Sequence, residues 1–158
     1  MTITIRKSEQ KDINSLIEFQ LRMAKETEGL ELNLERLSKG VTAVFSDHTK
    51  GIYYVAEIEN KVVASLLTTY EWSDWRNGQV IWIQSVYVLP EFRRQGIYKK
   101  MYLHLKDMVE KSEYLLGLRL YVEKDNITAQ KTYSDLGMDG EHYKMFEWLN
   151  RNPGEKFI

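Results

Sequence analysis

The segment with the clearest chemical potential is Arg93-Arg94-Gln95-Gly96-Ile97-Tyr98, which follows an apolar run and opens a helical pattern. A strand, a short loop and a helix start form an anion site, because backbone N–H groups and the positive helix end converge there. A pyrophosphate would fit such a site, and a side chain in place of Gly96 could block its close approach to the backbone. Taken alone, the same residues also fit a solvated basic turn.

A second stretch, Tyr70 to Trp82, combines carboxylates with three of the four tryptophans of the protein. Aromatic faces beside carboxylates suit an ammonium group through cation–π and charge attraction, which favours a cationic amine as ligand. Arg76 could instead recruit a carboxylate on the ligand. Core packing or cross-strand pairing accounts equally well for Trp82, and solvated loop charges account equally well for Glu71 and Asp74.

The elements that must position these residues follow from hydrophobic periodicity. Alternation predicts a strand over Thr2–Arg6, and helical spacing predicts two amphipathic helices between residues 12 and 46, with Asp12 as the cap of the first. Further strands are predicted over Ile52–Ile58, Val62–Trp72, Val80–Val88, Leu118–Val122 and Tyr143–Leu149, and further helices over Gly96–Tyr114 and Ile127–Leu136.

Turn signals connect the three central strands. Glu59-Asn60 offers a tight turn and Asn77-Gly78 a hairpin tip, so sequential antiparallel pairing is the simplest arrangement. Gly137 stands where a left-handed helix stop belongs. The order of elements predicts a mixed α/β layer structure.

Composition limits the classes of protein to which the chain can belong. At 158 residues we expect one domain, over residues 1–149, with a tail at 150–158. The 22 basic and 23 acidic side chains nearly cancel, which argues against nucleic acid or a membrane as partner. The absence of cysteine excludes disulfides and thiolate sites, and no metal is expected. No apolar block resembles a signal peptide or a membrane span, so the cytoplasm is the default location.

From its first strand to roughly Leu149, the chain resembles the GNAT acetyltransferase superfamily. The coenzyme A loop of that family reads Arg or Gln, two residues, Gly, one residue, then Gly or Ala, and Arg93, Gly96 and Tyr98 occupy its three places. Tyr98 departs from the small residue usual at the third place. Downstream, Leu120 to Ala129 and Tyr133 to Met138 resemble the strand, asparagine, helix and closing block of the family, with Met138 replacing phenylalanine.

The resemblance implies a mostly antiparallel sheet with splayed strands and acetyl-CoA as cosubstrate. A backbone N–H of Val86 or Val88 would face the thioester carbonyl, Asn126 would bond the pantetheine arm, and Tyr133 would protonate the leaving thiolate. The residues that the resemblance places at the cofactor are Val86, Tyr87, Val88, Arg93, Arg94, Gln95, Gly96, Ile97, Tyr98, Lys99, Asn126 and Ala129.

The resemblance further implies acetyl transfer to an amine of a small molecule or peptide by direct attack in a ternary complex. A primary alkylamine with a pKa of about 10.4 must lose a proton first, so a base or a water chain should help. The candidate bases are Glu71 and Asp74, and the residues expected at the acceptor are Trp72, Trp75, Trp82 and Gln84, of which Gln84 could hold a water. A catalytically silent acyl-CoA-binding module of the same fold is the alternative, and a homodimer is left open.

Overall fold

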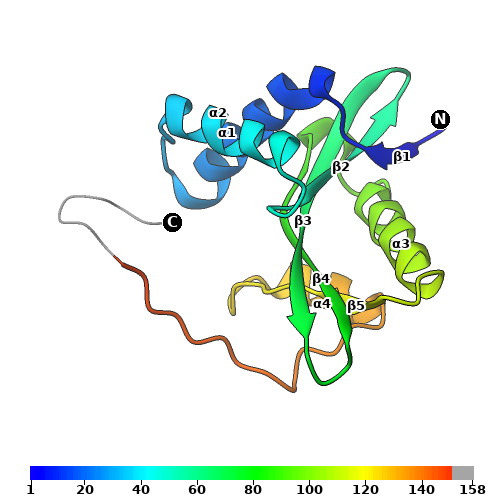
Figure 1. Ribbon diagram of the computed structural model, residues 1–158. Coiled ribbons are helices and arrows are strands. Elements are labelled where there is room, and N and C mark those ends of the chain that lie inside the picture. The colour runs from blue at the N-terminus through cyan, green and yellow to red at the C-terminus, as the bar shows by residue number, and fades with distance from the viewer. Residues whose placement is uncertain (151–158) are drawn as a thin grey trace. The chain divides into compact units, whose positions relative to one another are not determined.

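The computed structural model describes residues 1–150 (Figure 1). The chain divides into two compact units, one from Met1 to Leu120 and one that begins at Tyr121. Within the described residues, the first unit contains a five-stranded sheet and three α-helices, and the second contains one α-helix. The predicted mixed α/β class is confirmed. The single domain over residues 1–149 stays a prediction, and the predicted tail lies, from residue 151 on, outside the described residues.

The sheet follows the order of the chain. Its strands are β1 (Thr4–Lys7), β2 (Ile52–Ile58), β3 (Lys61–Ser73), β4 (Gly78–Val88) and β5 (Leu115–Arg119), in the spatial order β1-β2-β3-β4-β5. The first four strands pair antiparallel, and β5 pairs parallel to β4. A mostly antiparallel sheet was expected and is confirmed.

The helices of the first unit are η1 (Gln10–Asp12), α1 (Ile13–Glu28), α2 (Leu34–Ser46), η2 (Pro90–Phe92) and α3 (Ile97–Glu110), and α4 (Ile127–Asp135) belongs to the second unit. Their ends carry local signals. Gly29 ends α1 in a left-handed conformation with φ 63°. Asn33 Oδ1 accepts a hydrogen bond from Arg36 N at 2.8 Å and so caps α2.

Helices cover both faces of the sheet in the first unit (Figure 1). Tyr53 and Val55 of β2 lie in one buried cluster with Leu16, Val41 and Val44 of α1 and α2. Successive strand residues point to opposite faces, so Tyr54 points the other way, toward α3. There its hydroxyl contacts Met108 Sδ at 3.5 Å, and its ring centroid lies 5.8 Å from that of His104.

Two short turns join β2, β3 and β4. Glu59 and Asn60 connect β2 to β3 with φ values of 49° and 64°, which is the type I′ pattern that suits the twist of a hairpin. Ser73 pairs with Gly78, so the four residues Asp74 to Asn77 form the second turn, and Asn77 has φ 50°. The two predicted hairpins and their antiparallel pairing are confirmed.

Asp12 does not cap α1 as predicted, because its side chain makes no capping bond to that helix. It is 3% exposed and instead accepts bonds from Arg6 Nη1 at 2.7 Å, Arg6 Nη2 at 3.0 Å and Glu9 N at 2.7 Å. Arg6 also donates to Glu57 at 2.7 Å. The buried ion pair of Asp12 with Arg6, together with the bond from Arg6 to Glu57, thus joins β1, β2 and the start of α1.

Two predicted strands are wrong in place or in kind. The last strand of the sheet covers Leu115–Arg119, three residues earlier than predicted, because Gln79 N bonds to Tyr114 O at 2.9 Å and sets the parallel register. Gly78 permits this approach, since a Cβ there would lie 2.8 Å from Tyr114 O. Residues 143–149 form no strand, because no described strand pairs with them and their backbone groups remain outside a ladder.

Candidate functional site

The start of α3 has the geometry of an anion site. Gly96 precedes the helix with φ 75° and ψ 14°, a left-handed conformation that side chains disfavour. A Cβ at this position would meet no atom within 4 Å, so backbone conformation and not internal crowding requires glycine. Lys100 N donates to Gly96 O at 3.0 Å. The helical hydrogen bonds of α3 therefore begin at Lys100 N, and the backbone of the first turn before it has the geometry that favours an anion.

Side chains around this loop divide into inward and outward groups. Ile97 is 2% exposed and packs in the core, so it can offer a ligand only its backbone. Arg94 and Lys99 are exposed, and Arg94 has φ 61°. Gln95 Nε2 donates to Glu91 O at 3.0 Å, which holds the loop against η2. Arg94 and Lys99 are therefore the loop cations best placed to meet an anion from solvent.

Arg93 is held by the protein itself. Its Nη2 donates to Glu26 Oε2 at 2.7 Å, and its Nε donates to Val88 O at 2.9 Å. The guanidinium carbon also lies 5.4 Å from the centroid of the Tyr87 ring. These contacts tie the loop to α1 and to the end of β4.

A β-bulge interrupts β4 just before this loop. Leu67 pairs with Gln84 and Ser65 pairs with Tyr87. Between these two pairs β3 advances by two residues and β4 by three, so β4 contains one extra residue. Ser85 takes φ 53°, a conformation that few residues other than glycine adopt. A bulge of this kind turns backbone groups out of the ladder and redirects the strand. It lies where the resemblance placed the oxyanion donor, at Val86 or Val88.

The second edge of β4 is only partly paired. Strand β5 pairs with it from Gln79 to Trp82. Beyond Trp82, β3 is the partner of β4, and no other described strand pairs with residues 83–88. This is the splayed pair that the resemblance implied. Tyr87 is 4% exposed, so its side chain belongs to the interior.

A polar row crosses β3, β4 and β5 on the sheet face that also carries Leu67. Glu71 Oε1 accepts from Trp82 Nε1 at 3.1 Å, and Glu71 Oε2 accepts from Arg119 Nη1. Gln84 Nε2 donates to Thr69 Oγ1 at 2.9 Å. Glu71 and Arg119 are about one third exposed, at 39% and 34%. Both oxygens of this candidate base therefore already accept hydrogen bonds from the protein.

The tip of the β3–β4 hairpin presents aromatic rings to solvent. Trp75 is 91% exposed and Trp72 is 61% exposed, so core packing does not explain either residue. Asp74 Oδ1 accepts from Trp75 N at 2.9 Å and shapes the turn. In contrast, Trp82 is half-buried and bonded to Glu71, which fits a role in cross-strand packing.

The second unit contains the two remaining predicted residues. Asn126 Oδ1 accepts from Ala129 N at 3.1 Å and caps α4, as expected for one of its two proposed roles. Tyr133 lies two turns along this helix and is half-buried. Burial raises the pKa of its hydroxyl above the ordinary tyrosine value. The hydroxyl is thus protonated at neutral pH, as a general acid must be. Gly137 follows the helix with φ 88°, as predicted.

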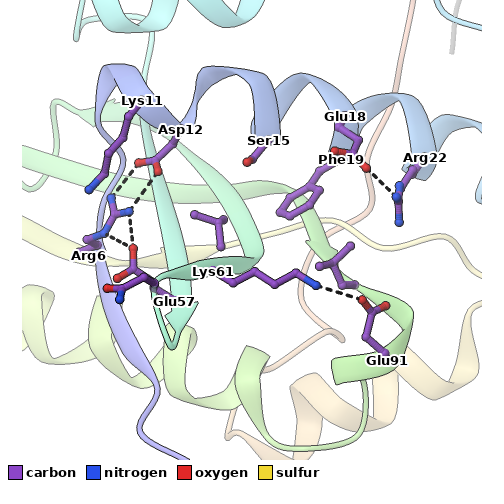
Figure 2. Close-up of a pocket in the computed structure, with 13 residues that line it drawn as sticks. Arg6, Lys11, Asp12, Ser15, Glu18, Phe19, Arg22, Glu57, Lys61 and Glu91 are labelled. Atoms are coloured by element: carbon purple, nitrogen blue, oxygen red, sulfur yellow. Dashed lines mark hydrogen bonds and ion pairs between the residues drawn. The ribbon is translucent and has the colours of Figure 1, made fainter.

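A pocket of about 580 Å³ lies beside α1 and the β2–β3 turn (Figure 2). Its charged lining consists of Arg6, Lys11, Arg22, Lys61, Asp12, Glu18, Glu57 and Glu91. Figure 2 shows that most of these charges face one another, and ion pairs join Arg6 to Asp12 and Lys61 to Glu91. None of the predicted site residues lines this pocket.

A family model described as the acetyltransferase (GNAT) family matches residues 12–138. The chain belongs to the GNAT family. A possible acetyltransferase from Clostridium difficile 630 is 45% identical, with 96% of this chain and 100% of that chain covered and a TM-score of 0.89. No curated protein sequence matches the chain significantly.

Two more distant solved structures share the GNAT fold. One is a predicted acetyltransferase from Clostridium acetobutylicum, solved with acetyl-CoA, with 22% identity, 96% of each chain covered and a TM-score of 0.70. The other is glucosamine-6-phosphate N-acetyltransferase from Arabidopsis thaliana, with 23% identity, 95% and 100% coverage and a TM-score of 0.71. At these identities the likeness supports the fold and not a shared acceptor.

Two residues of this GNAT protein that contact the predicted site were not identified from the sequence. Glu26 lies in α1, 67 residues before its partner Arg93, and Arg119 lies 48 residues after Glu71. Helical and strand periodicity report which face of an element is apolar, but not which distant charge it meets. Within residues 1–150, no helix is long and apolar enough to cross a membrane, and no cluster of acidic and histidine side chains could hold a metal ion.

Proposed function

We propose that the protein transfers an acetyl group from acetyl-CoA to an amine by direct attack in a ternary complex. The observation that carries this proposal is the continuous segment from the β-bulge at Ser85 to the left-handed Gly96 at the start of α3. It combines an irregular strand end, which can turn an N–H group toward a carbonyl, with a helix start that can bind phosphate. Family membership supports the same reading.

Different parts of the cofactor would meet different residues in and after this segment. The first-turn N–H groups of Ile97 to Lys99, with the side chain of Arg94, would hold the pyrophosphate. A backbone N–H of Val86 or Val88 would stabilise the developing oxyanion. Asn126 would bond the pantetheine arm. Acetyl-CoA would supply the activated thioester, and these residues would orient it.

The acceptor would arrive at the β3–β4 hairpin. Exposed Trp72 and Trp75 can hold an ammonium group over an aromatic face, and Asp74 adds a negative charge beside them. The amine must then lose a proton. Glu71 already accepts bonds from Trp82 and Arg119, and Asp74 lies in the turn beyond Gly78. A water held near Gln84, which is two residues from Val86, is therefore the better candidate for the base. Tyr133 would donate the proton that the leaving thiolate needs.

A second function is favoured by one observation. The engagement of Glu71 with Trp82 and Arg119 removes one of the two candidate carboxylates from simple base chemistry. A domain of this kind could bind an acyl-CoA without turnover, as a regulatory or interaction module. Such a module would bind acetyl-CoA but release no thiol with any amine.

Release of free CoA thiol, measured against a panel of polyamines, amino acids, aminoglycosides and peptides, separates these two functions. Turnover with any amine supports the transferase. Binding of acetyl-CoA by calorimetry without turnover across the panel would support the silent module. Failure of well-folded protein to bind acetyl-CoA at high micromolar concentration would remove both. The Gly96→Asp variant serves as the matched negative control, since it places a negative charge at the loop.

The proposal also concerns the partner of the protein, its location and its oligomeric state. The near balance of acidic and basic residues favours a small-molecule or peptide amine over nucleic acid or a membrane as partner. Cytoplasmic location and a homodimer stay predictions. Light scattering on the purified protein, with and without acetyl-CoA, tests the second of these.

A further inference from the structure

The end of α1 is hydrogen-bonded to the cofactor loop through one carboxylate. Glu26 Oε1 accepts from the Tyr87 hydroxyl at 2.7 Å, and Glu26 Oε2 accepts from Arg93 Nη2 at 2.7 Å. The three residues come from a helix, the bulged end of β4 and the loop before α3. A single side chain thus connects the three segments that surround the proposed phosphate site.

The geometry gives Arg93 a role inside the protein. Its Nε donates to Val88 O at 2.9 Å while its Nη2 reaches Glu26, so the two ends of one guanidinium join the strand exit to α1. Arginine suits this task because its planar fork presents several donors at fixed angles. The neighbouring Arg94 is exposed and carries no such bond among those described. Arg93 therefore holds the loop in place, whereas Arg94 faces solvent.

The protonation states of the group support this arrangement. The bond from Arg93, followed by the bond from Tyr87, lowers the pKa of Glu26 below its ordinary value. Burial, followed by the bond to Glu26, raises the pKa of Tyr87. At neutral pH the carboxylate is charged and the phenol is protonated, so both donors and both acceptor oxygens are correctly matched. Phe19 packs on Tyr87 with ring centroids 5.3 Å apart and limits its movement.

We propose that Glu26 is a positioning residue for acetyl-CoA binding, and this rests on the proposed function. Both of its carboxylate oxygens bond to protein partners, so it would act on the cofactor through them. It holds Arg93 and Tyr87 so that the end of β4 and the loop before Gly96 keep the form in which their N–H groups converge. Loss of its charge releases Arg93 and lets the loop sample other conformations, which weakens cofactor binding without changing the chemical step.

Calorimetry with acetyl-CoA on Glu26→Gln and on Glu28→Gln tests this proposal. Both changes remove one negative charge from an exposed position near the end of α1, so Glu28→Gln controls for net charge and helix composition. We expect Glu26→Gln to raise the Kd roughly 5- to 30-fold, the effect of losing a charged, partly exposed hydrogen bond. Glu28→Gln should bind as the wild type does. At saturating acetyl-CoA, kcat should agree within about twofold for all three proteins.

Arg93→Lys provides the second variant. Lysine keeps the charge but offers a single nitrogen in place of the Nε and Nη2 that reach Val88 O and Glu26, so it should weaken binding to a similar extent. The double variant, with Glu26→Gln and Arg93→Lys, should bind acetyl-CoA no more weakly than the single variant with the higher Kd. Both changes disrupt the same contact between residues 26 and 93. Additive losses would contradict a shared role.

Hydrogen exchange of the amides from Arg93 to Lys99, in protein without cofactor, adds a readout that does not depend on activity. It should be faster in Glu26→Gln than in the wild type and unchanged in Glu28→Gln. Equal exchange and equal Kd in all variants would overturn the proposal. Tighter binding by Glu26→Gln would also overturn it, since Glu26 would then compete with phosphate for Arg93. Absence of acetyl-CoA binding by the wild type, with exchange altered as expected, would instead refute the proposed function.

Discussion

Substitutions at Gly96 can separate the conformational role of this residue from its role in binding. Its φ of 75° is unfavourable for alanine, and a Cβ would meet no atom within 4 Å, so the cost to folding is conformational alone. For Gly96→Ala that cost is about 1–2 kcal/mol, which corresponds to a fall in Tm of roughly 2–8 °C in a protein of this size. Gly137 has φ 88° and equally open surroundings, so Gly137→Ala should lose a similar amount.

Binding should distinguish the two sites. A methyl group at residue 96 would keep the phosphate farther from the loop N–H groups. The loss of one or two charged hydrogen bonds should then weaken acetyl-CoA binding roughly 10- to 100-fold. Gly137→Ala should keep the wild-type Kd. For Gly96→Asp, two unit charges about 4 Å apart repel by about 4 kcal/mol at an effective dielectric constant of 20, so a loss on the order of 10³-fold is expected.

The sharpest test compares Gly96→Asp with Gly96→Ala in unfolding temperature and in affinity for acetyl-CoA. Aspartate tolerates left-handed backbone better than alanine and is favoured at a helix N-terminus, so Gly96→Asp should unfold at a higher temperature than Gly96→Ala. Yet it should bind acetyl-CoA far more weakly. Thermal unfolding and calorimetry on the same samples measure both quantities. Equal Kd values for Gly96→Ala and Gly137→Ala, or wild-type affinity in Gly96→Asp, would refute the assignment of the loop.

Three further predictions concern other residues. Tyr133→Phe should lower kcat roughly 10- to 10⁴-fold with little change in the Kd of acetyl-CoA, and an unchanged kcat would leave the residue a packing role. Trp75→Ala should raise the acceptor KM about 2- to 5-fold and leave Tm unchanged, because the ring is 91% exposed; wild-type acceptor kinetics would place the acceptor elsewhere. Asp12→Asn should cost about 2–4 kcal/mol in urea unfolding at pH 7, because it breaks the buried pair with Arg6. Burial favours the neutral acid, but the bonds from Arg6 and the Glu9 amide outweigh it and lower the pKa of Asp12. Its stabilisation is therefore present above the unfolded pKa of about 3.9 and lost as pH falls through the folded pKa, and the variant should lack this loss below about pH 4.

The hairpins of the fold were predictable because their signals are local. Asn60 and Asn77 tolerate the positive φ that each adopts here, and alternating residues in the strands around them set the buried face. The position of β5 was not predictable in the same way. Residues 114–122 are apolar at most positions, so periodicity cannot choose a register, and the choice depends on the approach of Tyr114 O to Gly78.

The strand predicted over Tyr143–Leu149 shows the limit of composition. Aromatic residues favour a strand only where a neighbouring strand can bond to the backbone, and a single sequence does not say whether one is present. The residues of the site likewise differ in whether the sequence alone can predict them. The loop before α3 was found from a continuous motif, whereas the bond between Glu26 and Arg93 depends on how α1 packs on the sheet.

The agreement between strand order and chain order has a consequence for folding kinetics. Turns of two and four residues close the β2–β3 and β3–β4 pairs, so their loop-closure entropy is small and they can form early. The parallel pairing of β4 with β5 must wait for the crossover that includes α3. Gly96 and its neighbours lie within that crossover. We therefore expect a refolding chain to acquire its β2–β3–β4 meander first and its capacity to bind acetyl-CoA last.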